Sequence, residues 1–471
     1  MNKTCLKYIG KVLMGFSILL LFPIVIAIIY KESIFPYIVP SIISFITGFI
    51  LNSTKIENKN IYAKDGFIIV SLSWILICLL GSIPLMIDVK LNFFDAFFES
   101  VSGLTTTGAT IFDDVETLSK SILFWRSFMH FIGGMGVLAF VMAIVPLSKN
   151  DKSMHVLKAE MPGPSVSKLV PTIKKTLFYL YFIYISLTLL EFILLLFSGL
   201  KIFDSLVISI GTAGTGGFAI LNSSLATYPT FSKWIVTIFM FLFGINFNIY
   251  FLILMKDIKS ALKSEELKVY LFIYIASSLF IIFNTYQMFS SMNEAILSGF
   301  FHTSSIMTST GYSIGNINIY PSSCRILFLF LMLISACAGS TCGGFKIARL
   351  MLCLKTIKRD ILKLFHPNSV RIITFEGKKV EEDTLKSNST FLFLYIFIII
   401  ILLFIVSLEG ISLEQSINAV FSTFANVGLG FDISSFAAFS NFTKMALSIG
   451  MLFGRLEIFP LIILMTTLKR K

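Results

Sequence analysis

The sequence predicts an all-α polytopic membrane protein, and three observations lead to this fold class. The 471-residue chain is 56% hydrophobic and only 14% charged, whereas soluble domains carry about 25% charged residues. Its mean hydropathy is +0.88. It contains apolar runs of roughly 20 residues, the length that a helix needs to cross a bilayer. Because a segment that spans lipid must satisfy its own backbone hydrogen bonds, each run is expected to be a helix.

Ten such runs can be placed along the chain. The first follows MNKTCLKYIGK without a small-residue cleavage site, so we interpret it as a span and not as a removed signal. The predicted spans are 8–30, 34–51, 66–87, 121–147, 173–198, 231–255, 268–285, 324–353, 389–408 and 441–467.

The charges predict the orientation of these spans. The net charge is +12, and basic residues are concentrated in alternate connections, including the stretch 346–386 and the C-terminal Lys469, Arg470 and Lys471. The other connections are rich in Asp and Glu. Basic connections are typical of the cytoplasmic side, so both termini are predicted to be cytoplasmic. The basic balance therefore indicates membrane orientation and not nucleic-acid binding, while the acidic outer face would concentrate cations.

The stretch GLTTTGATIF at 103–112 belongs to a segment that recurs four times. Each copy begins with a semi-polar segment too short to span, continues through small residues and a glycine, and precedes an outer loop and a full span. Two spans per copy return the chain to its starting side, so the copies share one orientation, as in a parallel internal repeat. The segments are FFDAFFESVSGLTTTGATIF (93–112), IFDSLVISIGTAGTGGFAIL (202–221), ILSGFFHTSSIMTSTGYSIG (296–315) and LEQSINAVFSTFANVGLGFD (413–432). Near their starts they carry Asp95, Asp204, Glu294 and Glu414, which we interpret as helix caps.

The glycine loops suggest a chemistry for these repeats. Non-helical backbone at membrane depth is tolerated only where it is buried in protein or lines a wet cavity. Four such loops on one axis would supply rings of carbonyl oxygens, which can replace the hydration shell of K⁺. Glycine adopts the positive φ that this needs without steric cost. The pattern predicts four parallel M1–P–M2 (potassium-channel-like) repeats around a central pore, plus an extra N-terminal helix pair. The predicted filter residues are Thr106, Thr107, Gly108, Thr215, Gly216, Gly217, Ser309, Thr310, Gly311, Asn426, Val427 and Gly428.

Charged residues inside predicted spans need a separate explanation. Arg455 lies within the last span, where a central charge costs about 2.5–3.5 kcal/mol on insertion scales, so it should face a cavity or a partner. Snorkelling to an interface is the alternative, which the apolar residues on both sides disfavour. Glu457 lies on another helix face and is a poor local partner. Trp125 and Arg126 fit an interfacial anchor as well as a functional role, and Glu191 is interpreted as an unassigned helix contact.

A glycine-rich stretch, AGSTCGGFK at 338–346, interrupts the predicted span 324–353. Three glycines within six residues disfavour a continuous helix, since each costs about 1 kcal/mol relative to alanine. A simple kink between packed helices is the alternative. Further along, VRIITF and the residues after it alternate around a glycine, which predicts a small hairpin.

These motifs together resemble the Trk/Ktr/HKT superfamily of cation transporters, and within it the TrkH/TrkG-type subunit of bacterial potassium uptake systems. The resemblance covers nearly the whole length, including the N-terminal helix pair that shorter Ktr-type subunits lack. Further matching motifs are WRSFMHFIGGMG (125–136), ACAGSTCGGFKIAR (336–349), HPNSVRIITFEGKKV (366–380) and GRLEIFP (454–460).

The resemblance implies potassium uptake across the bacterial plasma (inner) membrane, with K⁺ as the transported ion and no organic cofactor. Relatives with serine at the first-loop glycine tend toward Na⁺, so Gly108 implies K⁺. The resemblance also implies an intramembrane gating loop at 337–345, and an arginine that forms an electrostatic barrier below the filter. The implied gate residues are Gly339, Ser340, Thr341, Gly343, Gly344, Lys346 and Arg455.

The resemblance further implies partners. A TrkA-type peripheral cytoplasmic nucleotide-binding regulator, sensing ATP/ADP or NAD, would dock on a basic inner surface formed by 346–386 and the loop 148–172. The chain itself has no G-x-x-x-x-G-K-[ST] phosphate loop. A homodimer, surrounded by membrane lipid, is implied as well.

The predicted division of the chain follows the repeats, and two other functions remain open at this point. A Na⁺- or H⁺-coupled symporter could use the same scaffold. A membrane hydrolase based on Ser340 is disfavoured, because no histidine lies deep in a nearby span. The predicted units are 1–60 (N-terminal helix pair), 61–150 (repeat 1), 151–262 (repeat 2), 263–365 (repeat 3 with the gating loop), 366–388 (cytoplasmic loop) and 389–471 (repeat 4).

Overall fold

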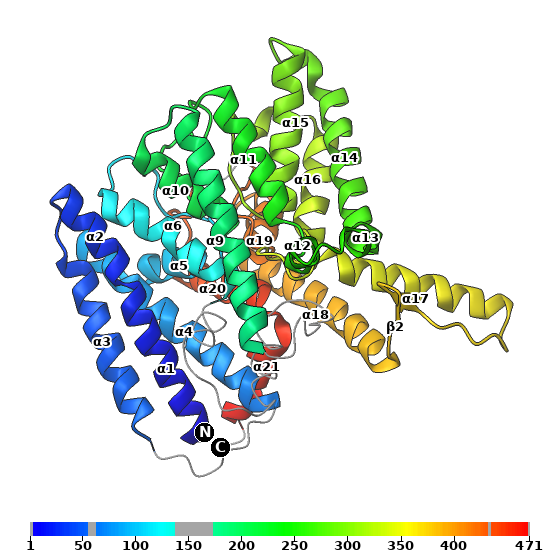
Figure 1. Cartoon of the computed structure of the whole chain (residues 1–471), viewed down its shortest axis with the longest axis horizontal. Helices are drawn as coiled ribbons and strands as arrows, with labels where there is room; N and C mark the ends of the chain where they lie inside the picture. The colour runs from blue at the N-terminus through cyan, green and yellow to red at the C-terminus, as the bar shows by residue number, and fades with distance from the viewer. Residues whose placement is uncertain (1–2, 55–62, 137–172, 432–434, 470–471) are drawn as a thin grey trace.

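The fold is almost entirely helical and is seen here in a computed structural model that describes residues 3–54, 63–136, 173–431 and 435–469 (Figure 1). Part of the predicted span 121–147, and the loop 148–172 predicted for the inner surface, lie outside the described residues. The N-terminal helices are α1 (Lys3–Leu19), α2 (Leu21–Tyr30) and α3 (Phe35–Asn52). Gly10 of α1 and Gly48 of α3 bring these two helices together, because an added Cβ at either one would lie 2.6–2.7 Å from the other's carbonyl oxygen.

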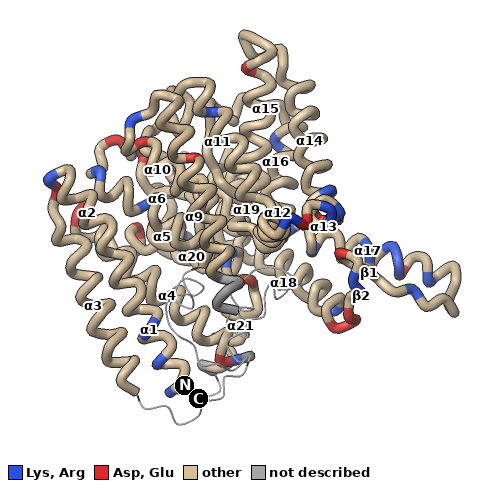
Figure 2. Tube along the Cα trace, in the orientation of Figure 1, with Lys and Arg blue, Asp and Glu red and all other residues tan. Residues whose placement is uncertain are grey.

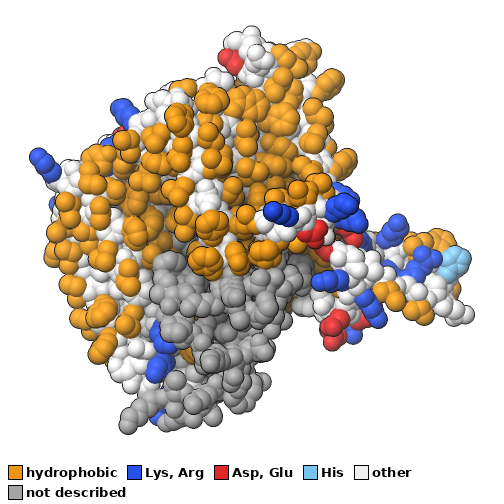
Figure 3. Space-filling view, in the orientation of Figure 1, with side chains coloured by type: hydrophobic (Ala, Val, Ile, Leu, Met, Phe, Trp, Pro, Cys, Tyr) orange, Lys and Arg blue, Asp and Glu red, His pale blue; other side chains and the backbone are white. Residues whose placement is uncertain are grey.

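Four long helices follow at intervals along the chain. They are α4 (Ala63–Asp88), α9 (Ile173–Phe197), α14 (Glu265–Thr285) and α18 (Glu382–Ser407). Among the described residues, six helices are long and apolar enough to cross a membrane, or up to eight if each bent helix pair counts as one span. The face in Figure 3 is covered largely by hydrophobic side chains, as a surface in contact with lipid requires. The membrane class predicted from composition is therefore confirmed.

Two predicted spans are bent and are not single straight helices. The run 231–255 forms α11 (Thr230–Phe243) and α12 (Phe247–Leu254), which meet at 91°. Asn246 caps the second helix, because its side-chain oxygen accepts a hydrogen bond from the Asn248 N–H at 3.0 Å. The run 441–467 forms α20 (Asn441–Leu456) and α21 (Ile458–Lys469), bent by 116° at Glu457, whose φ is +61°.

Four short helices occupy the semi-polar segments: α5 (Phe93–Leu104), α10 (Ile202–Ala213), α15 (Met292–Met307) and α19 (Leu413–Phe424). Three have 12 residues and one has 16, about 18–24 Å at 1.5 Å per residue, which is too short to span. Their caps differ from the prediction. Side-chain oxygens of Asn92, Ser291 and Ser412 accept the capping hydrogen bonds, and α10 has no side-chain cap. The acids instead lie in the first turns.

The glycine-rich interruption is present and lies between α16 (Ser322–Ile334) and α17 (Ile347–Phe365). Four residues in it have positive φ, namely Ser335, Gly339, Gly344 and Lys346, so it is an extended loop and not a kinked helix. Helix α17 projects from the rest of the molecule, and Lys and Arg are frequent along it and along α13 (Ile258–Lys263) (Figures 1 and 2).

The predicted hairpin follows α17. Its strands β1 (Thr374–Phe375) and β2 (Lys378–Lys379) are antiparallel, and Phe375 is opposite Lys378. Glu376 and Gly377 form the turn with φ of +50° and +71°, the combination that a two-residue hairpin turn needs. The remaining elements are α6 (Lys120–Met135), η2 (Tyr286–Met288) and η3 (Ile317–Ile319). Helix α1 begins and α21 ends on the same side of the molecule (Figure 1).

Candidate functional site

The four glycine loops have the same backbone conformation. In each, φ is positive at the first of the three predicted filter residues and again at the glycine. The values are +58° and +80° at Thr106 and Gly108, +52° and +73° at Thr215 and Gly217, +53° and +82° at Ser309 and Gly311, and +57° and +76° at Asn426 and Gly428. Twelve predicted residues from four distant segments thus adopt one repeated structure.

The four loops also form a closed ring. A Cβ added to Gly108 would lie 2.0 Å from the carbonyl oxygen of Gly216 in the second loop. A Cβ added to Gly217 would lie 1.8 Å from Thr310 O. One added to Gly311 would lie 2.1 Å from Val427 O, and one added to Gly428 would lie 2.1 Å from Thr107 O. Each glycine therefore faces the carbonyl of the middle residue in the next loop, and the fourth loop returns to the first. The structure brings all the predicted filter residues together around one axis.

Side-chain hydrogen bonds hold the ring, and they differ from one loop to the next. Asn426 donates from Nδ2 to Thr107 Oγ1 at 2.8 Å and to the Met451 carbonyl at 3.0 Å, so the fourth loop is bonded to the first. The hydroxyls of Thr308 and Thr310 lie 2.7 Å apart in the third loop. No other loop has an asparagine at this position, so the ring is only roughly fourfold.

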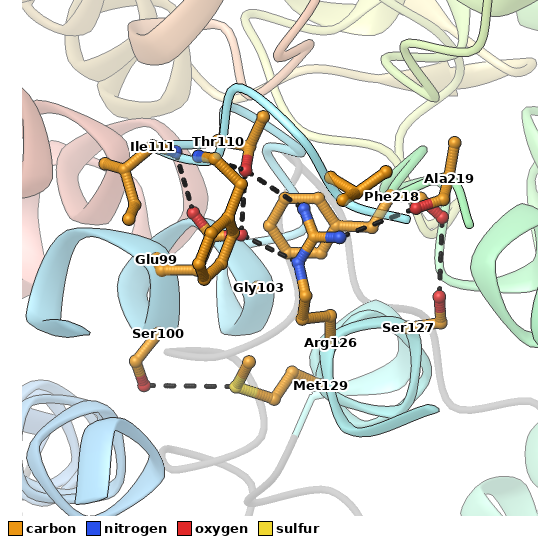
Figure 4. Close-up of polar contacts among 12 residues, drawn as sticks. Glu99, Ser100, Gly103, Thr110, Ile111, Arg126, Ser127, Met129, Phe218 and Ala219 are labelled. Carbon is orange, nitrogen blue, oxygen red and sulfur yellow. Dashed lines mark hydrogen bonds and ion pairs between the residues drawn. The ribbon is translucent and has the colours of Figure 1, made fainter. Parts of the chain in front are cut away.

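A buried ion pair supports the first and second loops (Figure 4). Glu99 of α5 accepts hydrogen bonds from Arg126 Nε at 2.8 Å, from the Ile111 N–H at 3.0 Å and from Thr110 Oγ1 at 3.1 Å. Arg126 also donates to Thr110 Oγ1 and to the Ala219 carbonyl of the second loop. Its side chain is 1% exposed and that of Glu99 is 0% exposed. The pair fixes the backbone just after Gly108.

The expectation that Trp125 and Arg126 form an interfacial anchor is wrong. Both are buried, and Trp125 Nε1 donates to the Gly81 carbonyl. Two further residues of the site, Glu99 and His130, were not predicted from the sequence. Glu99 pairs with Arg126, and His130 has its Nδ1 2.7 Å from Gly103 O while its Nε2 accepts a hydrogen bond from the Phe218 N–H at 3.3 Å. Both connect α5 or α6 to a filter loop, a contact that no local spacing reveals.

The interruption between α16 and α17, residues 335–346, lies directly against the ring; it contains the predicted gating loop 337–345, and we keep the name gating loop for it below. Its Gly343 N–H donates to Ser309 Oγ at 3.0 Å, and a Cβ on Gly343 would lie 2.6 Å from Asn426 Cβ. The loop is bonded to the α11–α12 bend, where Cys337 N donates to Gly244 O and Phe247 N donates to Gly339 O, each at 3.1 Å. The bend and the gating loop therefore form one hydrogen-bonded unit.

Arg455 joins the ring, the gating loop and α6. Its guanidinium donates to the Thr341 carbonyl at 2.6 Å, to Thr106 Oγ1 at 3.3 Å, and to the carbonyls of Gly133 and Gly134. The side chain is 7% exposed, so snorkelling to an interface is excluded. It lines a cavity of about 40 Å³ together with Gly339 and Ser340 of the gating loop. The Glu457 carboxylate pairs with Arg349 at 2.5 Å.

The other predicted gate residues lie in the same place. Lys346 is 1% exposed, and its ammonium donates to the Cys342 carbonyl and lies 3.5 Å from Ser340 Oγ. Gly344 is packed against Ser335. Glu191 is buried in α9, as expected for a residue that contacts other helices and not lipid.

This arrangement, spanning helices around four converging re-entrant loops, defines a membrane transport protein. The TrkH family model, described as a cation transport protein, matches residues 37–470. The chain therefore belongs to the TrkH family, which confirms the resemblance seen in its motifs and the prediction that it is not an enzyme.

Individual relatives match over almost their whole length. The chain is 32% identical to the Trk system potassium uptake protein TrkG of Escherichia coli over 95% of this chain and 94% of that one. It is 30% identical to the Trk system potassium uptake protein TrkH of Vibrio parahaemolyticus over 98% of both. The crystal structure of the potassium transporter TrkH from Vibrio parahaemolyticus superposes with a TM-score of 0.89 at 28% identity, covering 100% of this chain and 99% of that one.

Proposed function

We propose that the chain takes up K⁺ across the plasma membrane through a selectivity filter formed by its four glycine loops. The observation that carries this proposal is the closed ring, in which the carbonyls of Thr107, Gly216, Thr310 and Val427 occupy equivalent positions. Backbone carbonyls can replace the water around a dehydrated K⁺. The short helices end at the ring, so their negative C-terminal ends favour a cation there. Relatives named as potassium uptake proteins support the choice of ion.

The gating loop and Arg455 are proposed to close this pathway from the cytoplasmic side. The loop lies against Ser309 and Asn426, and the guanidinium beside it carries a full positive charge close to the ring. A cation leaving the ring toward the inside meets both a backbone obstruction and a like charge.

The gate is proposed to respond to a cytoplasmic nucleotide-binding regulator of the TrkA type, in a homodimer of this chain. The projecting basic helix α17 and the hairpin after it offer the exposed surface for such a partner. The word "system" in the names of the relatives supports an assembly of more than one component. A symporter coupled to Na⁺ or H⁺ is the alternative on the same scaffold.

The filter is tested by ⁸⁶Rb⁺ and ²²Na⁺ uptake into proteoliposomes by the wild type and by Gly108→Ser. A side chain at φ +80° that meets a carbonyl 2.0 Å away must distort the ring, and strain of this kind costs about 1–3 kcal/mol. We expect Rb⁺ preference over Na⁺ to fall about tenfold or more, since 1.4 kcal/mol corresponds to a factor of ten. Gly315→Ser is the matched control, because nothing lies within 4 Å of a Cβ there. Unchanged discrimination in Gly108→Ser would refute the filter assignment.

A further inference from the structure

The gating loop is held by a buried carboxylate that belongs to a different helix. Glu266, in the first turn of α14, is 3% exposed. Its Oε1 accepts a hydrogen bond from the Ala338 N–H in the gating loop at 2.6 Å, and its Oε2 lies 3.5 Å from Asn246 Nδ2 at the α11–α12 bend. A buried N–H that loses its acceptor is strongly unfavourable. Glu266 is therefore one of the groups that hold the loop in this conformation, and the one that connects it to α14.

The position of Glu266 is in turn set by the cytoplasmic hairpin. Glu376, in the hairpin turn, accepts a hydrogen bond at Oε1 from the Glu266 backbone N–H at 3.0 Å and another from Ser264 Oγ at 2.8 Å. These donors lie at the N-terminus of α14, where backbone N–H groups have no partner within the helix. The hairpin carboxylate thus completes the end of α14 from outside the helix.

A lysine closes the connection between the hairpin, α14 and α17. Lys355 of α17 donates from Nζ to the Thr374 carbonyl of β1 at 2.8 Å and contacts the Glu265 carboxylate of α14. The hairpin is therefore connected to the first turn of α14 directly through Glu376 and indirectly through Lys355, so a displacement of the hairpin is transmitted to that turn. Glu376 lies in a tight two-residue turn, where its φ is +50°. From this turn its side chain reaches the N-terminus of α14.

We propose that Glu376 and Glu266 are positioning residues that couple the cytoplasmic hairpin to the gating loop. The chain of contacts runs from Glu376 through the α14 N-terminus and the Glu266 carboxylate to the Ala338 N–H. Displacing the hairpin shifts Glu266, removes the acceptor of Ala338 and releases the loop from beneath the ring. The inference rests on the proposed function, because it assigns the means by which the cytoplasmic face controls that gate.

The test is basal ⁸⁶Rb⁺ uptake by full-length chain in proteoliposomes, without any regulator, for alanine and glutamine variants of both residues. Glu376→Ala and Glu266→Ala remove the acceptor, and we expect each to raise uptake about tenfold, within the usual size of coupling between two sites. Glu376→Gln and Glu266→Gln keep an acceptor oxygen and are expected to stay within about twofold of the wild type. Glu381→Ala is the matched control, since it removes a carboxylate from the same cytoplasmic segment without touching α14 or the gating loop.

The double variant separates coupling from general loosening. Residues that act in one series give non-additive effects, so Glu266→Ala/Glu376→Ala should take up no more Rb⁺ than Glu266→Ala alone, with Rb⁺ preference over Na⁺ unchanged. Additive effects, or Glu376→Ala behaving like Glu381→Ala, would overturn the proposal. If Glu266→Ala elutes as aggregate, the exposed Glu376 series decides by itself. A wild type without Rb⁺-selective uptake would instead refute the proposed function.

Discussion

Four glycines occupy positions where a side chain would collide with the neighbouring loop. At Gly108, Gly217, Gly311 and Gly428 the distance from an added Cβ to a carbonyl oxygen is 1.8–2.1 Å, far inside van der Waals contact. Positive φ alone would have been tolerated by other residues, as Thr106 and Asn426 illustrate. The contact between loops is therefore the stronger reason for glycine.

Among single residues, Arg126 should have a large effect on stability. Removing one partner of a buried ion pair leaves the other charge uncompensated, at about 3–5 kcal/mol. We expect Arg126→Met to lower the free energy of unfolding by about that amount and Glu99→Gln/Arg126→Met to recover part of it, measured by unfolding in detergent. Arg371→Met, at an exposed position, is the control. Equal stability of Arg126→Met and the control would show that the pair contributes nothing.

Arg455 is expected to affect transport. Replacement by glutamine keeps hydrogen-bond donors for Thr341 and Gly133 but removes the charge near the ring. We expect Arg455→Gln to raise Rb⁺ uptake about tenfold, since lowering a barrier by roughly 1.4 kcal/mol has that effect. Two like charges within about 10 Å of each other repel by more than this even at an effective dielectric constant of about 20. Arg371→Gln is the control. If Arg455→Gln takes up Rb⁺ no faster than this control, Arg455 does not act in the gate.

At the scale of elements, the segments that follow the first and second glycine loops are joined by a reciprocal hydrogen-bond network. Asn222 donates from Nδ2 to Asp114 Oδ1 at 2.8 Å and accepts from the Val115 N–H at 2.8 Å, while the Glu116 carboxylate accepts from the Asn222 N–H at 3.0 Å. The hydrogen bond from Asn222, followed by that from the Glu116 N–H, lowers the pKa of Asp114.

This network predicts a dependence of stability on pH. A carboxylate with a lowered folded-state pKa stabilises the fold above its unfolded pKa of about 3.9, and the contribution is lost as the pH falls through the lower folded-state value. We expect the wild type to have a higher Tm than Asp114→Asn at pH 6 and the difference to shrink below about pH 4. Asp383→Asn, at an exposed position in the first turn of α18, serves as control. A difference that does not vary with pH would contradict the assignment.

Local patterns predicted the short helices, the glycine loops, the interruption and the hairpin, because spacing and residue type within ten or twenty positions determine them. The bends at Asn246 and Glu457 were missed because the apolar residues on both sides of each bend were assigned to one span, although Gly244 and Asn246 interrupt the first run and Gly454 and Glu457 interrupt the second. The caps at Asn92, Ser291 and Ser412 were missed because acids nearby were more conspicuous. The Glu99–Arg126 pair and Glu266 depend on contacts between distant segments. The division of the chain into units stays a prediction.

For the whole molecule, the driving force distinguishes a channel-like pathway from a symporter. A membrane potential of 100 mV supplies about 2.3 kcal/mol per charge, which corresponds to roughly fiftyfold accumulation. We expect Rb⁺ to accumulate in proteoliposomes with the potential alone, and collapse of Na⁺ or pH gradients to leave the accumulation unchanged. Accumulation that follows either gradient would favour the symporter.

The order of contacts in the ring bears on how the protein is made. Its last junction joins Asn426 to Thr107, 319 residues apart in the chain. Until synthesis has passed Asn426, the first loop lacks one of its two neighbours and the ring is not closed. A nascent or truncated chain without the fourth loop therefore has only three of the four sides of the ring, and we expect such a chain to conduct no ion during assembly.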